Sequence, residues 1–263
     1  MYCIAIAILM LATSLQAFGQ ARGAGGPAAG GRGGPGGPRG GRAAAPFDMT
    51  GYWVSVVGED WRWRMYPNKG DYGSTPLNAV ARNIADAWDP AKDAAAGEGC
   101  RAFAAPVVMR IPGRLHITWQ DDQTLKIETD AGKQTRMFHF GNPPQAQTED
   151  WQGASKAEWD LGNAGAGGLF FGRGAGGARS GSLKVVTTKM RPGYATRNGV
   201  PYSNNATLTE YYDLVKEKNG AEYLVLTSMF ADPVYMTQPM WTAVHFRKQA
   251  DASGWNPVGC GGK

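Results

Sequence analysis

Residues able to do chemistry concentrate in one short segment early in the chain. Its sequence runs Glu59-Asp60-Trp61-Arg62-Trp63-Arg64-Met65. Read as a β-strand, this segment puts Trp61, Trp63 and Met65 on one face and the two arginines on the other. If the arginines point into a barrel, each guanidinium group needs an acid or an anionic ligand; in the opposite orientation both are solvated. Both orientations stay open, and Asp60 becomes a candidate acid or base.

A second polar and aromatic run is Glu210-Tyr211-Tyr212-Asp213. Inside a barrel, Glu210 could act as a general acid or base if burial raised its pKa. The alternative is a polar outer face that alternates with buried apolar residues. The side chains expected to line a ligand cavity are Trp61, Arg62, Trp63, Arg64, Trp119, His139, Tyr211 and Tyr212.

The three histidines, His116, His139 and His245, lack the spacing of metal ligands. Adjacent strands could still bring them together, but ordinary hydrogen-bonded strand histidines are the simpler interpretation. No nucleotide-binding or nucleophile-elbow motif occurs at a predicted strand-to-helix turn, where its chemistry would require it. We therefore expect no metal and no cofactor.

These residues lie within a series of short segments with alternating or β-branched character. Turn residues separate the segments, which favours hairpin connections and an all-β, antiparallel barrel of about nine or ten strands. Helical spacing at 75–89 and 91–96 predicts one or two short helices between the second and third strands. The predicted strands are 51–57, 61–66, 115–120, 124–129, 134–140, 155–161, 183–190, 206–215, 222–230 and 240–248.

The N-terminal segment of the chain indicates export to the periplasm or the cell exterior. Residues 1–19 resemble a cleaved signal peptide, and we expect no transmembrane segment in the mature chain. Residues 20–46 form a Gly/Arg/Pro-rich leader that we expect to be disordered. The barrel domain is expected at 47–263, with a flexible Gly-rich insertion at 162–181. Signal cleavage would remove Cys3 and leave Cys100 and Cys260, which we expect to form a disulfide in an oxidising compartment.

The net charge of +5 gives little reason to expect a nucleic-acid partner. Four arginines in the leader account for nearly all of it, so the folded domain is close to neutral. A nucleic-acid-binding domain usually carries a basic face.

Gly51-Tyr52-Trp53 resembles the G-x-W signature of lipocalin-like (calycin-type) barrels. The resemblance implies that Trp53 closes the barrel floor and that a basic residue of the last strand, Arg247, packs across its ring. A larger part of the chain is similar to a family of uncharacterised secreted bacterial proteins, which implies the same fold and no known catalytic residues. The stretches that carry this similarity are 59–65, 114–122, 128–132, 151–153, 208–213 and 232–239.

Three functions follow from this architecture. The first is a binding protein that holds a small apolar or aromatic molecule in the barrel cavity. The second is an envelope or extracellular interaction protein with a filled core. The third is an enzyme of isomerase, hydratase or cyclase type, in which Asp60 or Glu210 works with an arginine. We expect binding rather than catalysis.

Overall fold

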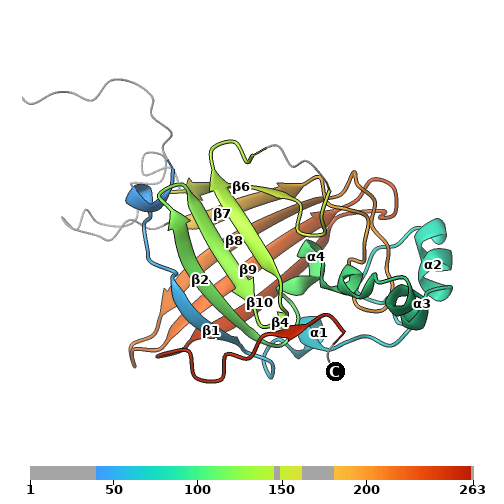
Figure 1. The fold of residues 1–263 in the computed structure, drawn as a ribbon, viewed down its shortest axis with the longest axis horizontal. Helices are drawn as coiled ribbons and strands as arrows, with labels where there is room; N and C mark the ends of the chain where they lie inside the picture. Colours follow the sequence, from blue (N-terminus) through green and yellow to red (C-terminus); the bar gives the residue numbers. More distant parts are fainter. Residues whose placement is uncertain (1–39, 145–148, 162–180, 262–263) are drawn as a thin grey trace, which may run out of the picture. The chain divides into compact units, whose positions relative to one another are not determined.

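The computed structural model describes residues 40–144, 149–161 and 181–261. The predicted signal peptide, most of the leader and nearly all of the 162–181 insertion lie outside these residues. Nine strands close into a barrel, in the order β1-β10-β9-β8-β7-β6-β5-β3-β2 (Figure 1). They are β1 Gly51–Ser55, β2 Arg114–Asp121, β3 Thr124–Thr129, β5 Thr135–Phe140, β6 Ala154–Asp160, β7 Ser182–Thr188, β8 Thr207–Lys216, β9 Glu222–Ala231 and β10 Met240–Lys248.

One pair of neighbouring strands departs from the expected antiparallel pattern. β5 and β6 run parallel, with Phe138 opposite Ser155, whereas the other neighbouring pairs in the barrel are antiparallel. A closed ring with an odd number of strands cannot alternate direction all the way round, so one parallel pair is required. β6 therefore begins at the same end of the barrel as β5.

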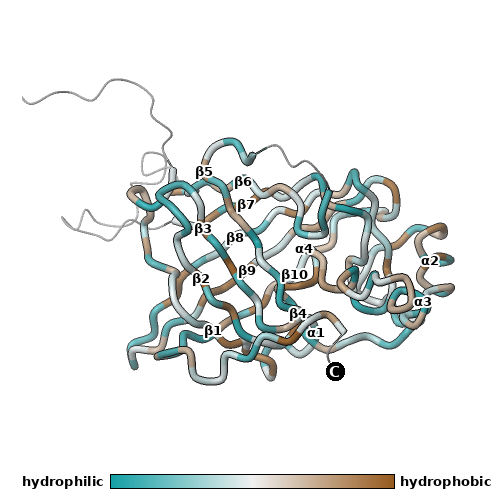
Figure 2. The backbone as a smooth tube through the Cα atoms, in the orientation of Figure 1, coloured by the Kyte–Doolittle hydropathy of each residue, from teal (hydrophilic) through white to brown (hydrophobic). Residues whose placement is uncertain are grey.

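The interior of the barrel is filled by side chains. Alternate residues of each strand point inward, as the buried positions of β3, β6 and β7 show, and hydrophobic and hydrophilic segments alternate along the strands in Figure 2. Ile127, Phe138 and Val185 are fully buried. The space in which a lumenal ligand was expected is therefore occupied by packed core residues.

Four short helices and a 3-10 helix lie between β1 and β2. They are α1 Trp61–Arg64, α2 Ala79–Asp86, α3 Pro90–Ala95, η2 Gly99–Phe103 and α4 Ala105–Val108. Val108 and Met109 join the core of the barrel, so α4 helps to close one end. A second hydrophobic cluster, including Ala195, Tyr202 and Met240, lies at the same end. Figure 1 shows α2, α3 and α4 gathered there.

The strand predicted at 61–66 is wrong, because α1 occupies this segment. The backbone N–H groups of Trp63 and Arg64 donate to the carbonyl of Asp60, which forms a single helical turn. Arg64 thereby points back to the ends of the neighbouring strands. Consequently, the helices follow the first strand of the barrel and not the second.

The other end of the barrel is covered by part of the predicted leader. Residues Arg42–Ala44 form the 3-10 helix η1, and Trp159 donates from Nε1 to the carbonyl of Gly41 at 2.9 Å. Ala44, Ala45 and Phe47 pack against the core. Residues 40–46, which we expected to belong to the disordered leader, therefore contact the barrel here, through half-buried apolar side chains and the hydrogen bond from Trp159.

The disulfide between Cys100 and Cys260 is confirmed and spans 160 residues of sequence. It joins η2 to the chain end beside a small parallel pair of strands, β4 Ala131–Gly132 and β11 Val258–Gly259. Within the described part of the chain, the helices are too short or too polar to cross a bilayer.

Candidate functional site

A pocket of about 270 Å³ lies beside α1 at the helical end of the barrel. All four candidate residues of the 61–64 segment line it, although they belong to a helical turn and not to a strand. The remaining walls come from the chain after α1, from α4 and the residues that follow it, from the loop 191–205, and from the start of β10. The lining residues outside α1 include Met65, Tyr66, Asn68, Asp71, Val107, Arg110, Ile111, Thr196, Arg197 and Met240.

Large apolar side chains at this pocket are unusually exposed. Trp61 is 64% exposed, Met65 59% and Tyr66 51%. Isolated exposed apolar residues are common on protein surfaces, but three within six residues around one hollow form a patch of the kind that binds ligands or partners.

Arg64 anchors α1 to the barrel and is not free to bind a ligand. It is 1% exposed, and its Nε donates to Asp60 Oδ2 and to the Val56 carbonyl, both at 3.1 Å. Its Nη2 donates to the His245 carbonyl at 2.5 Å, and its guanidinium lies 4.5 Å from the centre of the Phe246 ring. Burial lowers the pKa of Arg64, and the carboxylate of Asp60 opposes that shift.

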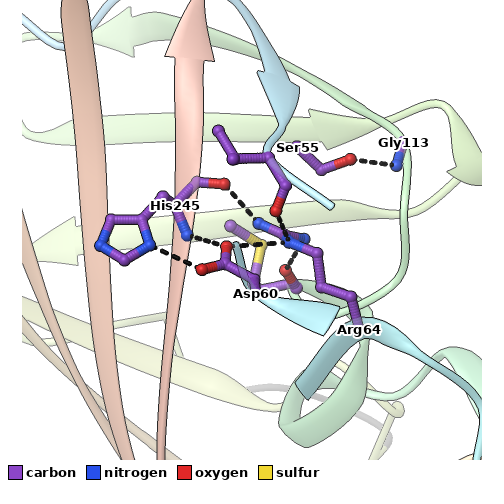
Figure 3. Close-up of polar contacts among 7 residues, drawn as sticks. Ser55, Asp60, Arg64, Gly113 and His245 are labelled. Carbon is purple, nitrogen blue, oxygen red and sulfur yellow. Dashed lines mark hydrogen bonds and ion pairs between the residues drawn. The ribbon is translucent and has the colours of Figure 1, made fainter. Parts of the chain in front are cut away.

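Asp60 is the centre of this network, as Figure 3 shows. Its Oδ2 also accepts the backbone N–H of His245 at 2.5 Å, and its Oδ1 lies 2.7 Å from His245 Nδ1. The carboxylate is only 4% exposed. Asp60 therefore joins α1 to β10, and its oxygens are engaged by Arg64 and His245.

Arg110 brings a different kind of cation to the pocket. It follows α4, and its Nη2 donates to the carbonyl of Ala195. Its Nε is buried and has no hydrogen-bond partner in the described part of the chain. Burial alone lowers the pKa of Arg110 to about 10, with no carboxylate contributing to the shift. The guanidinium group therefore stays charged at neutral pH, and no described carboxylate forms an ion pair with it.

Arg197, in the loop 191–205, also lines the pocket and lies close to two aromatic rings. Its guanidinium carbon is 3.9 Å from the centre of the Tyr66 ring and 4.8 Å from that of Phe103. Among the described residues it makes no ion pair. Stacked in this way, a guanidinium keeps its in-plane N–H groups available to a further partner.

Hydrogen bonds join the loop 191–205 to the segment that follows α1. Buried Asn198 donates from Nδ2 to the carbonyls of Asn68 and Asp71, at 3.1 and 2.8 Å. The loop 191–205 is closed on itself by the hydrogen bond from the Ala195 N–H to the Val200 carbonyl, at 2.8 Å. These bonds preorganise the site, which reduces the cost of binding.

The remaining predicted site residues lie elsewhere. Glu210 and Tyr212 are buried inside the barrel, where Glu210 forms a bidentate pair with Arg136 at 2.8 and 2.6 Å. Trp119 packs against the core, and Tyr211 lies on the opposite face of β8 from Tyr212. His139 is half-buried beside a separate, smaller hollow.

The expected partner of Trp53 is replaced by the next residue along β10. Lys248 Nζ lies 4.5 Å from the centre of the Trp53 ring, whereas Arg247 is exposed. Trp53 itself is fully buried and donates to the Met49 carbonyl at 2.9 Å. The predicted cation at this position is therefore present, but one residue further on, because the pleat turns Arg247 outward.

The sequence analysis named Trp61, Arg62, Trp63 and Arg64 as cavity-lining residues, but of a strand facing the lumen, and it did not name Arg110 or Arg197. Arg110 and Arg197 lie in segments without periodicity, and only the packing of α4 and of the loop 191–205 places them at the same hollow. A second hollow of about 530 Å³ shares Tyr66, Ile111 and Arg197 with the first. In the described part of the chain, no cluster of three His, Cys, Asp or Glu side chains could hold a metal ion.

The fold and the pocket together define a closed nine-stranded β-barrel with a basic, aromatic hollow at its helical end. No protein-family model, curated protein or solved structure matches this chain.

Proposed function

We propose that this protein binds a small apolar or aromatic molecule in the pocket beside α1, and not in the barrel lumen. The observation that carries the proposal is the grouping of Trp61, Met65 and Tyr66, each more than half exposed, around one hollow. Small-molecule sites combine apolar and aromatic walls with a few polar groups, and this pocket has that composition.

We further infer that the barrel is of the lipocalin-like kind and that the protein is exported. A tryptophan of the first strand under a basic side chain of the last strand supports the first inference. The disulfide supports the second, because such bonds persist in oxidising compartments. The parallel β5/β6 pair is a feature that the resemblance to lipocalin-like barrels did not lead us to expect.

The geometry supports catalysis less well. Glu210 is 1% exposed and paired with Arg136, so a substrate could reach it only if the core opened. Asp60 is also buried and fully engaged. Neither carboxylate lines the pocket.

A second candidate function is an interaction protein of the envelope or the cell exterior. The filled lumen favours it, as does Trp241, which is 54% exposed on β10 and does not line the pocket. The two candidate functions involve different exposed tryptophans: Trp61 for binding in the pocket, and Trp241 for a protein–protein interaction.

The test is a fluorescence titration with N-phenyl-1-naphthylamine, a neutral apolar probe. We expect binding by the wild-type protein, weakened about fivefold or more in Trp61→Ala, since a lost aromatic contact costs roughly 1–2 kcal/mol. Trp241→Ala is the matched control and should bind as wild type does. Absence of probe binding by wild type, or equal losses in the two variants, would contradict the proposal.

A further inference from the structure

The pocket holds more positive charge than its own acids neutralise. Arg62, Arg110 and Arg197 line it, and Asp71 is the only acid among the described lining residues. Arg64 is balanced by Asp60 outside the pocket. The Asp71 carboxylate accepts the backbone N–H of Gly73 at 3.3 Å and forms no ion pair with a described residue.

Arg110 is a pocket-lining cation that forms no ion pair with a described residue. A buried polar group without a hydrogen bond is costly, and a charged one more so. Its Nη2 is held by the Ala195 carbonyl, which fixes the guanidinium in place but leaves its charge uncompensated. Such a group in a pocket wall is stabilised when a ligand supplies an anion.

Arg197 offers a complementary group on a rigid support. Its guanidinium carbon lies over the rings of Tyr66 and Phe103, and a stacked guanidinium keeps its in-plane N–H groups for a hydrogen-bonding partner. The planar fork of an arginine edge matches the two oxygens of a carboxylate.

We propose that the pocket binds small aromatic or alicyclic carboxylates, whose apolar body contacts Trp61 and Met65 and whose carboxylate is bound by Arg110 and Arg197. The proposal deepens the proposed function and rests on it. Arg62, which is exposed and lies 5.1 Å from the Trp63 ring centre, adds favourable charge at the rim.

The test compares 2-naphthoate with its neutral isostere 2-naphthamide by isothermal titration calorimetry. We expect wild-type protein to bind the carboxylate at least about tenfold more tightly, because hydrogen bonds to a charged acceptor are stronger than those to a neutral one. Arg197→Gln and Arg110→Met should each reduce this preference severalfold. Arg247→Gln removes an exposed arginine outside the pocket and should retain it.

Each other outcome has a definite meaning. Equal affinity for naphthoate and naphthamide overturns the carboxylate proposal and leaves the proposed function standing if N-phenyl-1-naphthylamine still binds. Failure of all three probes to bind wild type overturns both. Tighter binding of 2-naphthyl phosphate than of naphthoate rejects the carboxylate in favour of a phosphate. If Arg110→Met does not fold, as judged by circular dichroism, Arg197→Gln decides alone.

Discussion

At the scale of residues, Arg136 and Glu210 form an ion pair buried inside the barrel, where each charge depends on the other for compensation. Both residues are 1% exposed, and the network extends from Arg136 to the Thr187 hydroxyl at 3.2 Å and from Glu210 to the Tyr212 hydroxyl, also at 3.2 Å. Burial, together with the negative charge of Glu210, raises the pKa of Tyr212. The pair is thus enclosed on all sides and has a structural role.

Glu210→Gln should destabilise the protein by about 3–5 kcal/mol, because it leaves the Arg136 charge buried without a partner. Urea unfolding followed by circular dichroism measures this loss. Replacing both residues, as in Arg136→Met/Glu210→Leu, should recover most of it, since an apolar pair of similar size needs no charge compensation.

The matched control is Glu158→Gln on the outer wall. Glu158 pairs with Lys184 at 2.9 Å, and its side chain is 58% exposed. Exposed pairs contribute roughly 0–1 kcal/mol, so this variant should unfold close to wild type. Equal effects of Glu158→Gln and Glu210→Gln would show that the lumenal pair is solvated.

His139 provides a test of pH dependence at the residue scale. Burial lowers the pKa of His139, so the folded state favours the neutral ring. The unfolded chain then takes up the proton first, near pH 6.5, and the stability contributed by His139 is present above that pH and lost as the pH falls. An NMR titration should give His139 a midpoint below 6.5. A midpoint at or above 6.5 would contradict the packing described here.

At the scale of elements, the loop 191–205 forms one wall of the pocket through a glycine that no other residue can replace without strain. Gly199 has a φ of +87°, and a Cβ there would lie 2.3 Å from Cγ of Trp88. Gly220 has nearly the same φ, +86°, with nothing within 4 Å of the Cβ position. Alanine substitutions at the two glycines therefore share the cost of a left-handed backbone, but only the one at Gly199 adds a steric clash.

Gly199→Ala should destabilise the protein by about 1–3 kcal/mol more than Gly220→Ala, the extra loss being the cost of overpacking against Trp88. Gly220→Ala should itself cost about 1–2 kcal/mol through its left-handed backbone. Thermal unfolding of both variants measures the difference. Equal melting temperatures would mean that the loop does not pack on Trp88.

The elements differ in how well sequence reasoning predicted them. The period-two pattern of 124–129 and 240–248 defines strands because inward and outward residues alternate across the barrel wall. The same pattern at 61–66 was misleading, because Asp60 bonds both Arg64 and His245 and so holds this segment against β10 as a helical turn. Alternation along the sequence does not reveal such a tertiary contact. The aromatic and basic residue types at 61–64 led us to expect cavity-lining side chains there. The positions of Arg110 and Arg197 at the same hollow result from tertiary packing, which the sequence pattern does not reveal.

At the scale of the whole molecule, one covalent link joins the helical cover to the chain end. The Cys100–Cys260 bridge closes a loop of 160 residues. In the chain-entropy model such a loop contributes about 4–5 kcal/mol. Cys100→Ser/Cys260→Ser should lower the urea midpoint accordingly, and reduction of wild type should reproduce the loss. An unchanged midpoint in both cases would show that the bridge constrains nothing.

The central claim is that a small molecule binds beside α1 while the lumen stays filled. Titration of ¹⁵N-labelled protein with 2-naphthoate or 2-naphthamide, whichever binds more tightly, tests it by chemical-shift mapping. We predict that the largest shifts fall on the indole N–H groups of Trp61 and Trp63 and on the backbone around Arg110 and Arg197. Shifts centred on lumenal residues such as Ile127 and Phe138, or no shifts at all, would contradict it.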